Sequence, residues 1–568
     1  MVGVPRPVAA VFPAGNPIDA VAPVTSWSLE LEPVVTIPTS GGAAPRLETL
    51  VAGGQPGLAY VVDQRGPIWS FDPSAPGATP TLLLDVYDVV DQPHISNQTG
   101  VRGLAFHPDF AVPGADGFRT FYTAHSVTAA STPAPSAGGG PVTFASPGAT
   151  DHYSVVAEWA VDIGGVVDPN SYRELMRVGQ PFGDHNIGAI RFSPAAERGD
   201  ADYGNLYIAL GDGGSAFPVQ QNGLDVFGAG QDLDTPLGGL LRINPMPRGG
   251  APFTVPADNP FFTTGDATSA REAAWAYGLR NPSTFDWDPV SGRMLIADIG
   301  QSNIEEVNLG AAGANYGWGA REGTFQLTSG FAGGVNLVAA LPADHTTDGL
   351  TYPVAQYDHD PDNDDLRTGS WAVAGGAVYR GTQLPELAGR YFFGDFGTND
   401  GTLYTVAVDQ LVQHQDFSDP AGMHGGFIAP IQAVQLTAGG APTTLLDILR
   451  QQTGNPTLAR TDLRFGVGPG GELYVLNKHD GVVRRFAAVT GLLAGDHNED
   501  GRVDGADYAA WRSGLGDRFA PADLAGVLEH FGETLVQPGG VAGVSVPEPI
   551  ALTVVYAMFI PLASRRAR

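Results

Sequence analysis

Residues 463–486, LRFGVGPGGELYVLNKHDGVVRRF, alternate apolar and polar side chains in short runs on either side of the turn GPGG. Runs of this kind, split by a turn that carries proline or glycine, are typical of a β-hairpin. The pattern recurs at irregular spacing, and hardly any helical periodicity separates the copies before residue 488. The other hairpin units begin at Gly57 (GLAYVVDQRGPIWSFD), Gly103 (GLAFHPDF with FRTFYTAHS), Ala189 (AIRFSP with GNLYIALGD), Thr284 (TFDWDPVSGRMLIADIG) and Gly375 (GGAVYRGTQLPELAGRYFFGDF).

Repeated short-strand sheets predict an all-β fold, and we expect a six-bladed β-propeller because that arrangement leaves few exposed sheet edges. A long β-sandwich array is the alternative, but it would give more regular spacing. We expect the propeller to occupy residues 28–488, after an N-terminal segment of residues 1–27. Residues 127–150 are of low complexity and predict a surface loop.

Composition narrows the possible partners. The 568 residues carry a net charge of −30, and Lys478 is the only lysine. Nucleic acid and anionic membranes attract basic surfaces, so this balance argues against both. The chain has no cysteine, which excludes disulfides and thiolate chemistry.

Composition changes after Phe486, where an acidic loop precedes a helix-like run. The segment GDHNEDGRVDGADYAAWRSGLG from Gly495 has the ligand spacing of a calcium loop, and it resembles a dockerin repeat. We therefore expect residues 489–536 to form a small α-helical dockerin-like module of the EF-hand type, which implies a surface-protein partner. A solvated acidic loop is the alternative. The expected calcium ligands are Asp496, Asn498, Asp500, the Arg502 carbonyl, Asp504 and Asp507.

The C-terminal tail, residues 537–568, combines VPEP from Val546 with an apolar stretch and a final arginine cluster. It resembles the PEP-CTERM sorting signal, which implies a secreted or cell-surface protein. The apolar stretch is shorter than the roughly 20 residues of a membrane span. A buried C-terminal strand is the alternative. The first 25 residues predict no signal peptide.

Side chains able to do chemistry stand at the ends of strand-like runs far apart in the sequence, so the fold must bring them together. The segments that carry them resemble the glucose/sorbosone dehydrogenase family, soluble sugar dehydrogenases that use pyrroloquinoline quinone (PQQ) on a six-bladed propeller. The resemblance covers roughly residues 45–488. Its motifs are QTGVRGLAFHPDF (98–110), DHNIGAIRF (184–192), LYIALGDGG (206–214), LGGLLRINP (237–245), YGLRNPSTFDWDP (277–289), GQSNIEEVN (300–308), NYGW (315–318), GGAVYRG (375–381) and GRYFFGDF (389–396).

The resemblance implies roles for the substrate side of the site. His185 stands at the position of the general base, and an imidazole can accept a proton near neutral pH. Asp212 matches the carboxylate that orients this imidazole. Gln98 and Asp184 match residues that hold the sugar hydroxyls. A structural histidine is the alternative for His185.

The same resemblance places Arg280 and Asn281 beside the quinone, where a guanidinium stabilises developing negative charge. Structural pairing of Arg280 with a carboxylate is the alternative. Arg380 stands where the family's glucose-oxidising members have a lysine that holds the quinone's carboxylates. The two arginines that accompany that lysine have no counterpart in GDFGTNDGTLY from Gly394. A tricarboxylate would bind less tightly without them.

The family's catalytic calcium is bound by backbone carbonyls of a turn that matches Gly300 and Gln301, with a nearby carboxylate at Glu305. We therefore expect PQQ- and calcium-dependent oxidation of an aldose to a lactone, with electrons passed to an acceptor that the sequence does not identify. A non-catalytic, surface-binding propeller of the same fold is the alternative. The missing arginine pair and the dockerin-like module motivate it.

Overall fold

A computed structural model describes residues 17–18, 21–39, 42–75, 77–134, 140–214, 228–246, 250–332, 335–359, 372–396, 400–417 and 428–535. The whole sorting-signal-like tail (residues 537–568) and most of the N-terminal segment (residues 1–27) lie outside these residues.

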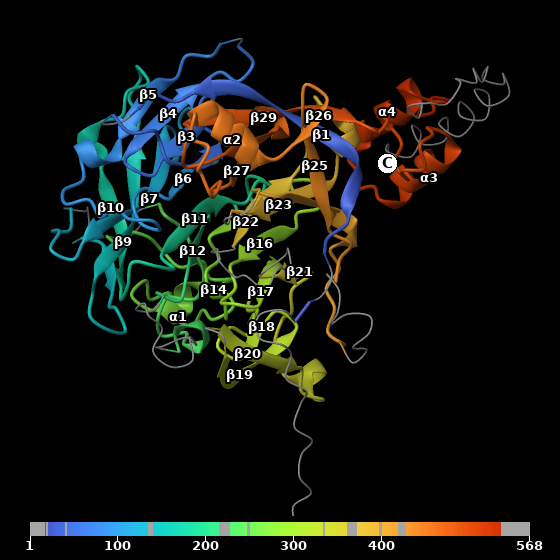
Figure 1. The fold of residues 1–568 in the computed structure, drawn as a ribbon. Coiled ribbons are helices and arrows are strands. Elements are labelled where there is room, and N and C mark those ends of the chain that lie inside the picture. Colours follow the sequence, from blue (N-terminus) through green and yellow to red (C-terminus); the bar gives the residue numbers. More distant parts are fainter. Residues whose placement is uncertain are drawn as a thin grey trace, which may run out of the picture.

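Strands dominate the structure, so the prediction of an all-β chain is confirmed (Figure 1). The described helices are short, and none is long and apolar enough to cross a membrane. The sequence predicts hardly any helix before residue 488, but a helix of nine residues, Leu445–Thr453, lies there. Its first turn is capped by the Thr444 hydroxyl, which accepts a hydrogen bond from Asp447 N (3.1 Å), and Gly454 ends it at φ 65°. The α-helices are α1 (Ala270–Ala273), α2 (Leu445–Thr453), α3 (Gly505–Ser513) and α4 (Leu524–Glu529).

Groups of four antiparallel strands recur along the chain. The groups are β2 (Leu47–Val51), β3 (Ala59–Asp63), β4 (Pro67–Phe71) and β5 (Thr81–Asp85); β6 (Gly103–Phe106), β7 (Thr120–Thr128), β9 (His152–Ala160) and β10 (Arg173–Gln180); β11 (Ile187–Phe192), β12 (Leu206–Leu210), β13 (Gly239–Ile243) and β14 (Ala274–Tyr277); β15 (Thr284–Trp287), β16 (Met294–Asp298), β17 (Ile304–Leu309) and β21 (Ala355–Asp358); β22 (Val373–Val378), β23 (Arg390–Asp395), β24 (Leu403–Ala407) and β25 (Gln432–Ala438); and β27 (Arg464–Val467), β28 (Leu473–Leu476), β29 (Val482–Thr490) and β1 (Val24–Thr36).

Additional strands extend these groups. β8 (Val142–Phe144) pairs parallel with β10, so the expected loop over residues 127–150 is in part a strand. β26 (Ala441–Thr443) pairs with β25. A separate three-stranded sheet contains β18 (Arg321–Glu322), β19 (Phe325–Ala332) and β20 (Val335–Ala340).

Strand β1 joins the two ends of the domain. It pairs parallel with β25 and antiparallel with β29, which links its group to that of β22–β25. The parallel pairing of β2 with β27 adds a third group, so that all three lie in one 13-stranded sheet. No sheet closes on itself within the part of the chain that the structure describes.

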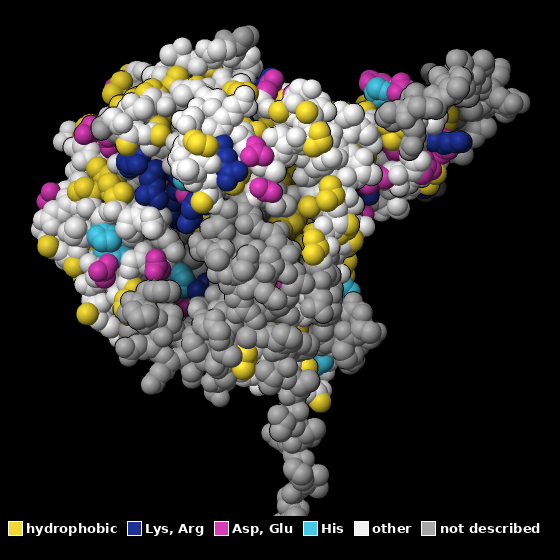
Figure 2. All heavy atoms as spheres, viewed as in Figure 1, with side chains coloured by type: hydrophobic (Ala, Val, Ile, Leu, Met, Phe, Trp, Pro, Cys, Tyr) yellow, Lys and Arg dark blue, Asp and Glu magenta, His cyan; other side chains and the backbone are white. Residues whose placement is uncertain are grey.

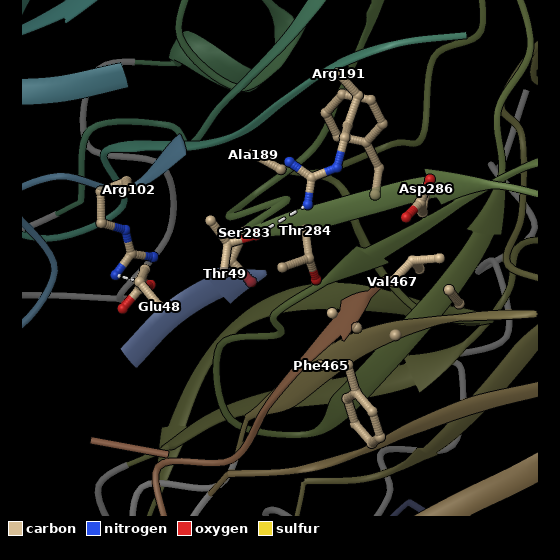
Figure 3. A pocket seen from close by; sticks show the side chains of 15 residues that line it. Glu48, Thr49, Arg102, Ala189, Arg191, Ser283, Thr284, Asp286, Phe465 and Val467 are labelled. Carbon is tan, nitrogen blue, oxygen red and sulfur yellow. Dashed lines mark hydrogen bonds and ion pairs between the residues drawn. The ribbon is translucent and has the colours of Figure 1, made fainter. Parts of the chain in front are cut away.

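The first strands of successive groups contact one another. β2 contacts β6, β6 contacts β11, β11 contacts β15, β15 contacts β22, β22 contacts β27, and β27 contacts β2. These strands surround a small polar hollow, where Arg102 and Glu48 meet in an ion pair (2.5 Å, Figure 3). The cavity described next lies where these strands begin and shares Arg102 and Ser283 with the hollow.

Candidate active site

A histidine–aspartate pair stands at the edge of the third group. His185 precedes β11, Asp212 follows β12, and His185 Nδ1 lies 2.6 Å from Asp212 Oδ1. Gly214 N and Trp318 Nε1 donate to the two Asp212 oxygens (2.9 and 2.8 Å), which fixes the carboxylate. With Nδ1 engaged, Nε2 is the His185 nitrogen available to a ligand.

Electrostatics keep Asp212 ionised. Burial raises the pKa of its carboxyl, but His185 and the Arg280 guanidinium outweigh burial, so the net pKa lies below the ordinary value. An ionised Asp212 can accept a hydrogen bond from His185 Nδ1–H, and its negative charge would stabilise an imidazolium at His185. The expected role of Asp212, to orient His185, is compatible with this geometry.

The backbone at His185 is in an uncommon conformation, with φ 51°. The Gln98 side chain stabilises it, since Gln98 Oε1 accepts a hydrogen bond from His185 N (3.0 Å). A Cβ at Gly211 would lie 2.4 Å from His185 O, so only glycine lets the two segments approach this closely. Strained backbone that the surroundings enforce is common at functional sites.

Arg280 and Asn281 are fixed by a buried carboxyl group. Asp298 Oδ2 and Oδ1 accept hydrogen bonds from Arg280 N (2.9 Å) and Asn281 N (2.6 Å). The Arg280 guanidinium lies over the Trp318 ring, 5.4 Å from its centroid. Trp318 in turn donates to Asp212, so the arginine and the histidine share one support.

The turn after β16 carries the expected calcium ligands, Gly300 and Gln301. Arg280 Nη1 donates to Gly300 O (2.5 Å), and Arg280 Nη2 donates to Gln301 Oε1 (2.6 Å). The guanidinium therefore already occupies the Gly300 carbonyl, one of the two backbone carbonyls expected to bind calcium, and its positive charge would repel a calcium ion placed there. These residues do not fit a calcium ion in this arrangement, and we derive no step through one here.

Glu305 is fully buried behind this turn and does not line the cavity among the described residues, which corrects its expected contact with a cofactor. It lies on β17, and its Oε2 accepts hydrogen bonds from Gly300 N (3.3 Å) and Val373 N (2.9 Å). Glu305 Oε1 lies 2.6 Å from His359 Nδ1. His359 lines the cavity, so Glu305 contacts a residue of the cavity wall without lining the cavity itself.

These segments enclose a cavity of about 420 Å³. Seven of the residues expected at the site line it, and Asp212 lies directly behind His185. The seven are Gln98, Asp184, His185, Arg280, Asn281, Gly300 and Gln301.

Basic side chains gather in the same cavity. It is lined by six of the chain's 30 lysine and arginine residues. Figure 2 shows Lys and Arg side chains clustered beside histidine on the face where β6, β11 and β27 lie. The arginine pair that the sequence lacks is thus not the only possible source of positive charge, because Arg102 and Arg280 of the matched motifs and four residues outside them line the cavity. The six are Arg46, Arg102, Arg280, Arg460, Arg464 and Lys478.

The basic cluster is only partly neutralised. Glu48 contacts Arg102 (2.5 Å) and Lys478 (2.7 Å), and the Arg464 guanidinium lies 3.5 Å away. Asp462 pairs with Arg460. The cationic side chains of the cavity wall outnumber the carboxylates that pair with them, so the cavity favours an anionic ligand.

Arg380 lies elsewhere, which corrects its expected role at the quinone. Its guanidinium forms two hydrogen bonds with Asp288 (both 2.7 Å) and donates to Arg518 O (2.5 Å). Arg380 follows β22, whereas Ala372 at the start of β22 lines the cavity. The strand thus carries Arg380 to the opposite end of the sheet, beside a second, more apolar groove.

The acidic loop before α3 is compact. Asp496 accepts hydrogen bonds from Asp500 N (3.1 Å) and Gly501 N (2.9 Å). Asp507, in the first turn of α3, accepts from Asn498 N (3.2 Å) and Asp504 N (2.7 Å). Backbone N–H groups donate to both carboxylates, and the described side chains of the loop include no group of three carboxylates with ligand atoms within 4.8 Å of one another. The calcium site here stays a prediction from the ligand spacing. The remaining members of the expected ligand set, Arg502 and Asp504, lie in the same loop.

Residues 183–424 match the family described as Glucose / Sorbosone dehydrogenase. The chain is 28% identical over 436 residues to the HIPL1 protein of Arabidopsis thaliana, which covers 66% of this chain and 55% of that protein. It is 26% identical over 215 residues to aldose sugar dehydrogenase YliI of Escherichia coli, which covers 37% of this chain and 47% of that protein. The chain thus spans about half the length of these relatives. The PQQ-bound aldose sugar dehydrogenase of Streptomyces coelicolor superimposes with a TM-score of 0.47 at 19% identity, covering 83% of this chain and 100% of that one.

Fold and cavity define an all-β protein with a histidine–aspartate pair beside a basic pocket. Residues 183–424 match the glucose/sorbosone dehydrogenase family model, which confirms the resemblance stated from the motifs over these residues.

Proposed function

We propose that this protein oxidises the anomeric hydroxyl of an aldose sugar to a lactone, with PQQ as cofactor. One observation carries the proposal: the His185–Asp212 pair opens into the cavity that six cationic side chains line. The pair supplies a base for a hydroxyl proton, and the cations supply partners for an anionic cofactor. The family match of residues 183–424 supports the same reaction class.

We also propose that the groups of four strands are the blades of a six-bladed propeller. The contacts of the first strands, from β2 through β6, β11, β15, β22 and β27 back to β2, support this arrangement. β1 would then complete the last blade from the N-terminal side. The cavity lies at the axis of such a propeller.

The wall of the cavity fits PQQ. Lys478, Arg464 and Arg460 would hold carboxylates of the cofactor, since charge-assisted hydrogen bonds to carboxylate are strong. Arg280 and Asn281 would lie at its quinone oxygens. When bound, PQQ supplies a hydride acceptor.

His185 supplies the proton chemistry. Its Nε2 takes the proton of the sugar hydroxyl, and Asp212 stabilises the imidazolium that forms. Gln98 and Asp184 line the cavity beside His185, where their side chains can accept hydrogen bonds from sugar hydroxyls. A positioned base of this kind contributes about 10²–10⁴ to the rate.

We propose calcium at the loop of Asp496 and Asp507, because its oxygen-bearing residues have the spacing of a calcium loop. We also propose residues 489–536 as a dockerin-like module that binds a surface protein. The sequence of the tail supports a secreted or cell-surface location. The electron acceptor is a partner outside this chain.

The purified full-length protein, supplied with PQQ and calcium, tests the proposal in a dye-reduction assay with a panel of aldoses. We expect turnover that His185→Ala reduces by at least 10²-fold. His530→Ala is the matched control, since His530 is a partly exposed histidine after α4. Full turnover in His185→Ala would disprove the mechanism. Calorimetry without detectable PQQ binding at micromolar concentration would favour a non-catalytic binding protein.

A further inference from the structure

The chain's only lysine lies in the wall of the cavity, where its amine can meet a ligand. Lys478 lines the cavity with a side chain that is 4% exposed. Its Nζ lies 2.7 Å from Glu48 Oε2, 3.2 Å from Gln64 Oε1 and 3.4 Å from Asn97 O. Asn97 also lines the cavity, so the longest and weakest of these contacts lies at the cavity surface. Loss of that contact would open one position of the nitrogen to a ligand.

The surroundings of Lys478 favour the neutral form of its amine. Burial lowers the pKa of Lys478 to about 7, although the Glu48 carboxylate raises it. The charges of Arg464 and Arg102 lower it as well. A neutral amine is nucleophilic, and buried lysines with lowered pKa values are the ones that form imines with carbonyl compounds. The proposed oxidation uses Lys478 only as a cation, so this property has no assigned role.

Glu48 keeps its negative charge beside the amine. Burial raises the pKa of Glu48, but Arg102 and Lys478 lower it to about 2. An imine of Lys478 that takes up a proton carries the same charge as the former ammonium group. Glu48 would therefore have a cationic partner before and after imine formation, and no buried charge would be left unpaired.

The cavity wall can hold an anionic group at the same time. The Arg46 guanidinium is half-buried in this wall and has no hydrogen-bond or ion-pair partner among the described residues. Burial lowers the pKa of Arg46, and the strongest opposing charge is that of Glu48, which is also the partner of Lys478. A guanidinium without a partner is a strong donor to phosphate or carboxylate. A ligand with its anionic group at Arg46 could therefore present a carbonyl group to Lys478.

We propose that Lys478 forms an imine with a small aldehyde that carries a phosphate or carboxylate group, and that Arg46 binds this anionic group. The Nζ lone pair forms a bond to the carbonyl carbon, and two hydrogens of the neutral amine leave with the carbonyl oxygen as water. A C=N bond replaces the C=O bond, so the condensation needs no oxidant, reductant or further reactant. The proposal does not depend on the proposed sugar oxidation, because the imine can be measured without sugar or quinone.

Pyridoxal 5′-phosphate is the probe, since it joins an aldehyde and a phosphate group in one small molecule. The full-length protein without PQQ is mixed with the probe at neutral pH, the imine is reduced with borohydride, and peptide mass spectrometry locates the adduct. We expect one equivalent at Lys478, where the α-amino group of the chain is the only competing primary amine. Pyridoxal, which lacks the phosphate, should label Lys478 about tenfold more slowly.

Two variants separate the roles of the amine and the guanidinium. Lys478→Arg keeps a cation beside Glu48 and should lose both the adduct and the visible absorption of the imine. Arg46→Gln should weaken the affinity for pyridoxal 5′-phosphate about tenfold. Arg271→Gln, at an exposed ion pair, is the matched control and should bind the probe as the unchanged protein does. Mapping of the adduct in the unchanged protein does not depend on the folding of any variant.

An adduct at the α-amino group alone would overturn the proposal. So would equal labelling of Lys478 by pyridoxal and by pyridoxal 5′-phosphate. PQQ should slow the labelling, because its carboxylates would occupy the same wall. Labelling of Lys478 that PQQ does not slow would still support this site, and it would instead contradict the proposed placement of the cofactor.

Discussion

Lys478 Nζ lies 2.7 Å from Glu48 Oε2, and this contact joins strands from opposite ends of the domain. Glu48 belongs to β2, and Lys478 follows β28. Burial lowers the pKa of Lys478 to about 7, although the Glu48 charge favours the protonated form. The chain's only lysine is therefore held close to its titration point, at the wall of the cavity.

Replacing Lys478 with Met should weaken PQQ binding about 10- to 100-fold, because a charged hydrogen bond contributes about 1.5–3 kcal/mol. Lys478→Arg keeps the charge and should retain most of the affinity. Calorimetry measures both, with Arg271→Met at an exposed surface pair as control. Unchanged affinity in Lys478→Met would remove this residue from the cofactor site.

PQQ affinity should fall as the pH rises through about 7, because Lys478 loses its proton there in the ligand-free protein. Folding stability, in contrast to PQQ affinity, should rise as the pH rises through this range. The unfolded lysine has a pKa of about 10.4, so this group's contribution to stability is greatest above that pH and is lost as pH falls through 7. Titrations between about pH 6 and pH 9 measure the effect. The same pH dependence in Lys478→Met would contradict this explanation.

Asp212→Asn should lower kcat by about 10²–10⁴, because an amide cannot stabilise a protonated His185 and can select the wrong tautomer. PQQ affinity should change little, since Asp212 lies behind the histidine. Steady-state kinetics and calorimetry on one preparation separate the two effects. Asp234→Asn, at an exposed ion pair, is the control and should leave kcat unchanged.

Arg380→Met should destabilise the protein by about 3–5 kcal/mol, because it leaves the buried Asp288 carboxylate without its partner. PQQ affinity should stay within experimental error, since Arg380 lies away from the cavity. Denaturant unfolding and calorimetry measure the two quantities. A loss of affinity without a loss of stability would restore the role expected from the sequence.

Asp507→Asn should abolish any rise in unfolding temperature that calcium produces, because Asp507 carries the last carboxylate of the loop. Asp523→Asn is the matched control: its carboxylate caps a turn before α4 by accepting from Ala520 N (2.7 Å) and belongs to no expected ligand set. Thermal scans with calcium and with a chelator make the comparison. Calcium stabilisation that survives Asp507→Asn would locate the ion elsewhere.

The meeting of His185 and Asp212 was predictable because both residues flank strands that the sequence marks clearly. His185 lies two residues before β11, and Asp212 lies two residues after β12. In an antiparallel group the start of one strand and the end of the next meet at the same edge. Motifs at such borders therefore indicate which side chains come together.

The basic wall was not predictable from the motifs. Arg46 precedes β2, Arg464 begins β27, and Lys478 follows β28, so the cluster depends on which strands become neighbours in space. Local patterning carries no information on that pairing. The signal available was the scarcity of basic residues: a single lysine in an acidic chain is a candidate for a site.

Strand length explains the error at Arg380. Its motif aligns with the family, but Arg380 stands eight residues beyond Ala372, which lines the cavity. At about 3.3 Å per residue, a strand of that length crosses the sheet from one end to the other. Alignment of a motif does not decide which end of its strand reaches the site.

Strand β1 has a consequence for synthesis on the ribosome. It waits unpaired until β25 and β29, its only described strand neighbours, have left the exit tunnel. Arg46 emerges early and Lys478 late, so the two sides of the basic wall meet only when nearly the whole domain has been made. A nascent or prematurely terminated chain therefore lacks the complete basic wall, and an anionic ligand can be held there only after the polypeptide is finished.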